Sequence, residues 1–266
     1  MTDTAKGFAA ATQPVAAQAI HTDTDGLSAA AITLNVNGQD VPVYYAKPAG
    51  KSDLPVLLVI SEIFGVHEHI ADVARRFAKQ GYLALAPDLF VRQGDASKVD
   101  SIAELLKGII AQTPDAEVMG DLDACVAWAA QNGGNADKLG ITGFCWGGRT
   151  TWLYSAYNPK VKAGVAWYGR LTGDKSAKQP QHPVDIAPTL TVPVLGLYGA
   201  LDHGIPLDHV DAMKAALAQG ASGSAFVVYP DADHAFHADY RPTYNEQDAR
   251  DGFARALAWF QQHGVA

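Results

Sequence analysis

The sequence has little cysteine and little positive charge. Only two of its 266 residues are cysteines, Cys125 and Cys145. So few cysteines exclude a disulfide-stapled fold and a cysteine-rich zinc module, and they are typical of a reducing compartment. Lysine and arginine together number 20 against 28 acidic residues, which leaves a net charge of −8. A nucleic-acid partner is therefore not expected, because such binding needs a basic surface.

The chain also lacks an apolar run that could cross a membrane. Its longest aliphatic run covers residues 54–60, whereas a bilayer span needs roughly 20 residues. Near the N-terminus, Ala17-Gln18-Ala19 resembles the cleavage site of a signal peptide, but the first residues hold Asp3 with a single Lys6. Polar residues then interrupt the apolar stretch that a signal needs. We expect residues 1–29 to form an extended arm, and the protein to be cytoplasmic.

Apolar residues are plentiful. Hydrophobic residues make up 48% of the chain and charged residues 18%, which predicts a large core and excludes disorder. The sequence shows no repeat and no linker. We therefore expect residues 30–266 to form one domain.

Patterns typical of strands and helices alternate along the chain. Asn37-Gly38 is a hairpin signal between strands expected at 31–36 and 41–46. The other strands are expected at 55–60, 82–86, 139–144, 162–167, 194–198 and 225–229, and the helices at 70–78, from 101, from 114 to 131, and at 150–157, 210–217 and 253–260. This order predicts an α/β fold: a mainly parallel sheet with an antiparallel N-terminal hairpin and helices on both faces.

A candidate nucleophile lies in Gly143-Phe144-Cys145-Trp146-Gly147. This is the G-x-S-x-G turn with cysteine in place of serine. A strand is expected before it and a helix after it, and a helix N-terminus favours a thiolate. The alternative is that Cys145 is a small buried apolar residue. We expect that of Cys125, which lies on the apolar stripe of its helix.

Two partners follow in the order acid, then histidine. Asp202 comes after the expected strand 194–198, and His234 comes after 225–229. Both would lie at the carboxyl edge of the sheet, where ligands of such folds bind. Alternatives remain open: Asp202 could cap the next helix, His203 could be the useful group, and Asp231 and Asp233 could only cap a turn.

Glu62 directly follows the expected strand 55–60. In a hydrolase of this kind, the loop after this strand supplies one backbone donor of the oxyanion hole, and the residue after the nucleophile supplies the other. We therefore expect the N–H groups of Ile63 and Trp146 in these roles. Glu62 could instead be an exposed loop residue, or the cap of the helix that starts near His67.

Taken together, the motifs resemble the dienelactone hydrolase (carboxymethylenebutenolidase) family from about residue 30 to the C-terminus. The motifs are Glu62-Ile63-Phe64-Gly65-Val66, Pro87-Asp88-Leu89-Phe90 with Arg92-Gln93, Gly143-Phe144-Cys145-Trp146-Gly147-Gly148, Tyr168-Gly169, Asp202-His203 and His234-Ala235-Phe236. The resemblance implies an α/β-hydrolase fold and a triad of Cys145, Asp202 and His234. It also implies that Glu62 pairs with the resting thiol and takes its proton when substrate arrives. Arg92 would help to hold a substrate carboxylate, and Tyr168 would contact substrate.

The chain departs from the enzymes of this family that degrade chlorocatechol. Those enzymes carry a second arginine four residues after the catalytic histidine, where this chain has Ala238, and Arg241 follows three residues later. They have leucine at the position of Trp146. The N-terminal arm is also additional. These differences bear on whether the substrate is carboxylated.

We therefore expect a hydrolase that opens a lactone or small carboxylic ester through a thioester on Cys145, with no cofactor or metal. Its partner is a small-molecule substrate, and it acts as a monomer or dimer. One alternative is a non-catalytic or thiol-sensing protein. Another is a metal-dependent hydrolase that uses His67-x-His69 and His234-x-x-His237, although no carboxylate stands at ligand spacing.

Overall fold

The computed structural model describes residues 18–266, and a mostly parallel sheet forms its centre. The strands are β1 (Leu27–Val36), β2 (Gln39–Pro48), β3 (Leu54–Ile60), β4 (Leu83–Pro87), β5 (Gly134–Phe144), β6 (Val161–Trp167), β7 (Val194–Gly199) and β8 (Ala225–Tyr229). They lie in the order β1-β2-β4-β3-β5-β6-β7-β8. β2 pairs antiparallel with both β1 and β4, and the other neighbours are parallel. This arrangement confirms the predicted fold class.

The hairpin turn has the backbone that its sequence predicts. Asn37 and Gly38 have φ angles of 53° and 82°, the left-handed values that an Asn-Gly hairpin turn requires. β1 begins at Leu27, four residues before the strand expected at 31–36, so the last residues of the expected arm belong to the sheet. Residues 18–26 of the arm are described, and the N–H of Thr22 contacts Asp72 there, whereas residues 1–17, on which most of the signal-peptide interpretation falls, lie outside the described residues.

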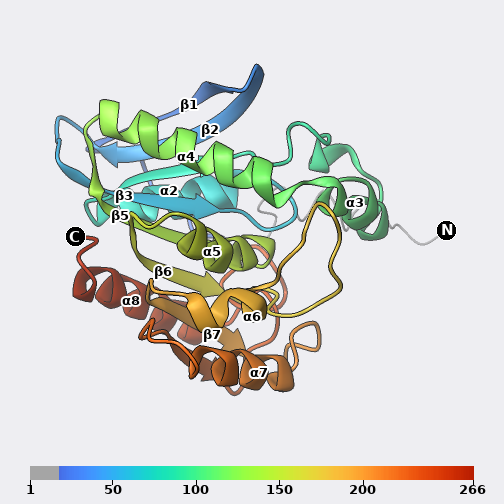
Figure 1. Ribbon diagram of the computed structural model, residues 1–266. Helices are drawn as coiled ribbons and strands as arrows, with labels where there is room; N and C mark the ends of the chain where they lie inside the picture. The colour runs from blue at the N-terminus through green and yellow to red at the C-terminus, as the bar shows by residue number, and fades with distance from the viewer. Residues whose placement is uncertain (1–17) are drawn as a thin grey trace.

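Helices cover both faces of the sheet. They are α2 (Glu68–Lys79), α3 (Ile102–Gly108), α4 (Asp115–Gln131), α5 (Trp146–Tyr157), α6 (Pro183–Ile186), α7 (Leu207–Leu217) and α8 (Glu246–Gln262), with single 3₁₀ turns at Ala96–Lys98, Ile110–Gln112 and Ala187–Thr189. Figure 1 shows α4 and α5 in front of the sheet and α2 and α8 behind it. Behind the sheet, Phe77 of α2 packs on Phe253 of α8 with ring centroids 4.8 Å apart. In residues 18–266, no helix is long and apolar enough to cross a bilayer.

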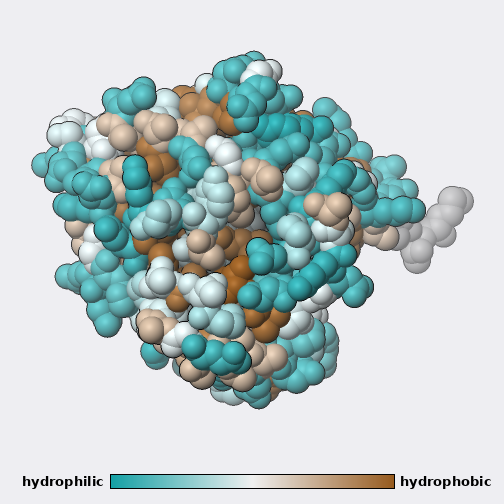
Figure 2. Space-filling view, viewed as in Figure 1, coloured by the Kyte–Doolittle hydropathy of each residue, from teal (hydrophilic) through white to brown (hydrophobic). Residues whose placement is uncertain are grey.

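The core is continuous around the central strands. Every residue of β4 is buried, and so is every residue of β3 except Pro55, as expected of parallel strands that are covered on both faces. The outer surface is mainly hydrophilic, with a hydrophobic patch near the middle of the face shown in Figure 2. The carboxyl ends of β3, β5, β7 and β8 carry the loops that hold Glu62, Cys145, Asp202 and His234.

Candidate active site

Cys145 lies in a strained turn between β5 and α5. Its backbone has φ 54° and ψ −111°, a conformation that residues with a Cβ rarely adopt. The turn is held by two backbone hydrogen bonds: the Cys145 N–H donates to the Trp167 carbonyl at 3.0 Å, and the Cys145 carbonyl accepts from the Arg149 N–H at 3.2 Å. The side chain is partly exposed, because the turn lifts it above the end of the sheet.

The two glycines of the motif are required by close packing. A Cβ on Gly143 would lie 2.2 Å from the carbonyl oxygen of Gly147. One on Gly147 would lie 2.3 Å from the carbonyl oxygen of Ile60. The preceding strand and following helix are both present, so the structural context predicted for this motif is confirmed.

Asp202 and His234 meet at the ends of β7 and β8. The Nδ1 of His234 lies 2.7 Å from Oδ2 of Asp202. The other oxygen of the buried Asp202 accepts from the backbone N–H groups of Gly204 and Ile205, at 2.8 and 3.1 Å. Asp202 is therefore fixed by its own loop and orients the imidazole.

The alternatives for these residues are not supported. The N-cap of α7 is Pro206, so the interpretation of Asp202 as a helix cap is wrong. His203 is exposed beside it. Oδ1 of Asp233 accepts from the N–H of His234 at 2.6 Å, and Asp231 is exposed. Neither of these acids provides the partner of the His234 ring, because Asp202 occupies that position.

His234 is electrostatically coupled to Cys145. Burial alone would lower the pKa of His234, but the charge of Cys145 and hydrogen bonds with Asp202 and Cys145 raise this pKa to about 11. An imidazolium is thus strongly favoured when the sulfur is a thiolate. The structure therefore brings Cys145, His234 and Asp202 together in one row, while their catalytic roles stay a prediction.

Glu62 is buried, with 1% of its surface exposed, and it interacts electrostatically with Tyr240 and Arg241, as does Cys145. The hydroxyl of Tyr240 donates to its Oε2 at 2.7 Å, and Nη1 of Arg241 lies 3.9 Å from its Oε1. The N-cap of α2 is His67. The interpretation of Glu62 as an exposed loop residue or a helix cap is therefore wrong.

A cavity of about 330 Å³ opens over Cys145. Its walls come from the loop after β3, from the segment around α3, from the elbow and from the loops after β6, β7 and β8. The lining residues are Ile63, Leu106, Ile110, Ala111, Cys145, Trp146, Arg149, Tyr168, Arg170, Gln179, Gly204, Ile205 and His234. Both residues expected to form the oxyanion hole, Ile63 and Trp146, thus line the same cavity as Cys145.

The two residues expected to bind substrate are placed differently. Tyr168 lines the cavity with its ring 5.2 Å from that of His234. Arg92 is not a lining residue, and its guanidinium makes paired hydrogen bonds of 2.6 and 2.8 Å to the buried carboxylate of Asp121. Arg170 is the exposed cation of the cavity wall, a residue that the sequence motifs do not single out.

The remaining candidates have structural surroundings. Cys125 is fully buried, and burial raises the pKa of its thiol, which keeps it protonated and unreactive. His237 is buried with its ring 4.6 Å from that of Trp167. Within residues 18–266, no three side chains of His, Cys, Asp or Glu are grouped so that they could hold a metal ion.

Sequence reasoning did not find Tyr240, the hydrogen-bond donor to Glu62. It lies in the irregular stretch between β8 and α8, where neither strand nor helix periodicity predicts a direction for the side chain. The only signal is its position beside Arg241, six residues after His234.

Known proteins are similar to this chain in sequence and in fold. Residues 41–264 match the dienelactone hydrolase family. A protein of Methylorubrum extorquens, provisionally named a carboxymethylenebutenolidase, is 56% identical over the whole of this chain and 92% of its own length. One of Salmonella typhimurium with the same provisional name is 53% identical over 97% of this chain and 96% of its own. A crystal structure from Klebsiella pneumoniae, provisionally described as a dienelactone hydrolase, is 53% identical, with a TM-score of 0.87 over 89% of this chain and 99% of its own. With its α/β-hydrolase sheet and a match that extends over most of its length, the chain is an enzyme of the dienelactone hydrolase family.

Proposed function

We propose that the protein opens a lactone or a small carboxylic ester through a thioester on Cys145. The observation that carries this proposal is the row of Cys145, His234 and Asp202, in which Cys145 and His234 line the cavity and the His234–Asp202 distance is 2.7 Å. A nucleophile, a base and a residue that orients the base are the minimum for this chemistry. Both cysteines are free thiols, which suits a reducing compartment, and we place the enzyme in the cytoplasm.

The first step activates the thiol. The proton of Cys145 passes to Oε1 of Glu62, the carboxylate oxygen that has no hydrogen bond. The sulfur then attacks the carbonyl carbon, and the electron pair of the carbonyl moves to its oxygen. The backbone N–H groups of Ile63 and Trp146 hold this oxyanion. When the oxyanion collapses, the C–O bond breaks, and the leaving oxygen takes the proton from Glu62.

His234 acts in the second step. While Cys145 is a thiolate, its charge holds the proton on His234. Formation of the neutral thioester removes that charge, so the pKa of His234 falls, a proton on its ring passes to solvent, and the neutral imidazole becomes available as a base. It takes a proton from water as the oxygen attacks the thioester, and collapse of the second oxyanion releases the acid and the thiolate. The proton on His234 then passes to the sulfur, which restores the neutral thiol of Cys145 and the neutral imidazole.

The experiment is turnover of a panel of small lactones and esters by the purified wild type, Cys145→Ala and Cys125→Ala. We expect Cys145→Ala to lose at least about a thousandfold in kcat/KM and Cys125→Ala to lose less than about twofold. Activity retained by Cys145→Ala would refute the thioester. If no ester or lactone is turned over while peroxide oxidises Cys145 readily, the thiol-sensing alternative gains support.

A further inference from the structure

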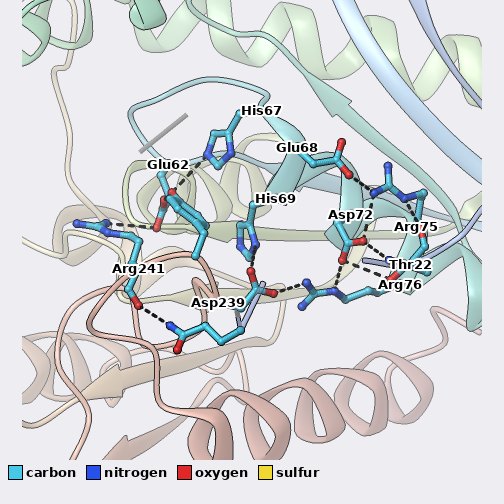
Figure 3. Close-up of polar contacts among 12 residues, drawn as sticks. Thr22, Glu62, His67, Glu68, His69, Asp72, Arg75, Arg76, Asp239 and Arg241 are labelled. Carbon is cyan, nitrogen blue, oxygen red and sulfur yellow. Dashed lines mark hydrogen bonds and ion pairs between the residues drawn. The ribbon is translucent and has the colours of Figure 1, made fainter. Parts of the chain in front are cut away.

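A buried polar network, formed by two hydrogen-bonded groups that meet through the ring contact of Tyr240 with His69, lies between Glu62 and the N-terminal segment. His69 contacts Asp239 at 3.1 Å, and Arg76 bridges Asp239 and Asp72. The backbone N–H of Thr22 donates to Asp72 at 2.5 Å. Figure 3 shows these contacts in sequence, with Glu62 and His67 at one end and Thr22 at the other. Tyr240 joins Glu62 and His67 at the active-site end of the network.

The hydroxyl of Tyr240 lies between two groups. It is 2.7 Å from Oε2 of Glu62 and 3.4 Å from Nε2 of His67. Burial is the main cause that lowers the pKa of His67, which falls to about 4, so this imidazole is neutral near pH 7. The shorter contact is the one with Glu62, and in it the hydroxyl of Tyr240 donates to Oε2.

This contact has a consequence for the ionisation of Glu62. Burial disfavours a carboxylate, whereas a hydrogen bond to the charged form favours it. Arg241 adds positive charge at 3.9 Å from Oε1, beyond hydrogen-bond distance. Tyr240 therefore supplies the direct hydrogen bond to this carboxylate, and it engages Oε2 while Oε1 has no hydrogen-bond partner.

We propose that Tyr240 is a positioning residue, which keeps Glu62 ionised and leaves Oε1 free to receive the Cys145 proton. This inference rests on the proposed thiol chemistry. The hydroxyl does not touch substrate, and it acts through the carboxylate alone. Four titratable or charged side chains interact electrostatically with Glu62: His67, Tyr168, Tyr240 and Arg241. The last three also interact with Cys145.

Tyr240→Phe removes the hydroxyl and keeps the ring, which packs on His67 and His69 with centroids 5.1 and 5.0 Å away. Without the donor, the buried carboxylate loses its direct hydrogen bond, so less of Glu62 is in the ionised form that can accept the Cys145 proton. We expect kcat to fall at least about tenfold and KM to change less than about twofold. Tyr244→Phe, a change in the same loop, serves as the control and should keep the wild-type kcat.

A second readout distinguishes this role from a loss of packing. The negative charge on Glu62 opposes a thiolate at Cys145. In Tyr240→Phe, Cys145 should therefore be alkylated faster than in the wild type at about pH 5.5, at a rate that approaches that in Glu62→Gln. The infrared carboxyl band that is lost in Glu62→Gln should titrate at higher pH in Tyr240→Phe. That measurement requires no turnover. Adding Tyr240→Phe to Glu62→Gln should change neither alkylation nor turnover further.

The inference would be overturned if Tyr240→Phe had the same kcat, the same rate of Cys145 alkylation and the same titration of the infrared carboxyl band as the wild type. So would a full further loss when the change is added to Glu62→Gln, because Tyr240 would then act independently of Glu62. A failure of the proposed function looks different. In that case Cys145→Ala itself remains active, whatever Tyr240→Phe does.

Discussion

In the proposed mechanism, Cys145 is the nucleophile, and Glu62 and His234 are the bases of the first and the second step. The neutral thiol can give its proton to a carboxylate, whereas hydrolysis of the later thioester needs a base that takes a proton from water. Asp202 serves the second base, because one of its oxygens is fixed by Gly204 and Ile205 and the other faces His234. At the scale of single residues, each side chain therefore has a separate proposed role, which a conservative substitution of that residue can test.

Asp202→Asn tests the orienting duty. The amide oxygen can still accept from the two backbone N–H groups, so the loop should keep its conformation. The charge that stabilises the His234 imidazolium is lost, and we expect kcat to fall about a thousandfold or more. The measurement is steady-state kinetics together with near-UV circular dichroism. A kcat within about tenfold of wild type would remove Asp202 from the mechanism.

Arg92→Ala tests whether this arginine binds substrate or supports the fold. Its paired hydrogen bonds to Asp121 predict a structural role, since the variant leaves a buried carboxylate without a partner. We expect a loss of about 3 kcal/mol in the free energy of unfolding. We also expect equal changes in KM for a carboxylated and a neutral ester.

The double variant Arg92→Ala/Asp121→Asn is the matched control. It removes the buried charge along with its partner, so it should recover part of the lost stability. A rise in KM confined to the carboxylated ester, with unchanged stability, would return Arg92 to the substrate-binding role that the family resemblance implies.

At the scale of elements, the turn from β5 into α5 is the feature on which the site depends. The carbonyl of Ile60, at the end of β3, leaves no room for a Cβ at position 147. Gly147→Ala should therefore displace the backbone that carries Cys145 and Trp146. We expect at least about a hundredfold loss of kcat, with a lower melting temperature.

Gly120→Ala is the control for that substitution. Gly120 lies inside α4, where an added Cβ meets nothing within 4 Å. Alanine there should leave activity unchanged and stabilise the fold by about 0.5–1 kcal/mol. Full activity in Gly147→Ala would show that the turn tolerates movement of the nucleophile.

Much of the fold and site could be predicted because local patterns determine them. The apolar run of β3 and the Asn-Gly turn predict their elements directly, and strands that end at one edge bring Cys145, Asp202 and His234 together. β1 begins earlier than its pattern because Leu27 pairs with Pro48 of β2, a tertiary contact that periodicity does not report. Tyr240 and the Arg92–Asp121 pair depend on irregular loops and partners distant in sequence, so neither could be predicted.

At the scale of the whole molecule, two buried histidines couple stability to pH. His67 is buried in a neutral form, with its pKa lowered mainly by burial to about 4. His237 is shifted in the same direction, again mainly by burial. Since the unfolded chain takes up protons near pH 6.5 and the folded chain does not, folding is favoured above that pH and progressively less below it.

We therefore expect the free energy of unfolding to fall between about pH 7 and pH 5, with about 2 kcal/mol of the loss due to His67 and a smaller opposing gain from His234, whose pKa is raised in the folded chain. Urea titrations at the two pH values measure this loss, and His67→Gln should reduce it. A stability that is constant over this range, or that increases towards pH 5, would show that these histidines are protonated in the folded protein.

The central claim is that an acyl group is carried by the sulfur of Cys145. The most direct measurement is intact mass followed by peptide mapping, after a rapid acid quench of enzyme mixed with an ester that it turns over. His234→Ala should accumulate the intermediate, because the base for its hydrolysis is missing. We expect an added acyl mass on the peptide that contains Cys145 and no added mass on the peptide that contains Cys125. Rapid turnover in Cys145→Ala, or an acyl group found on another residue, would contradict it.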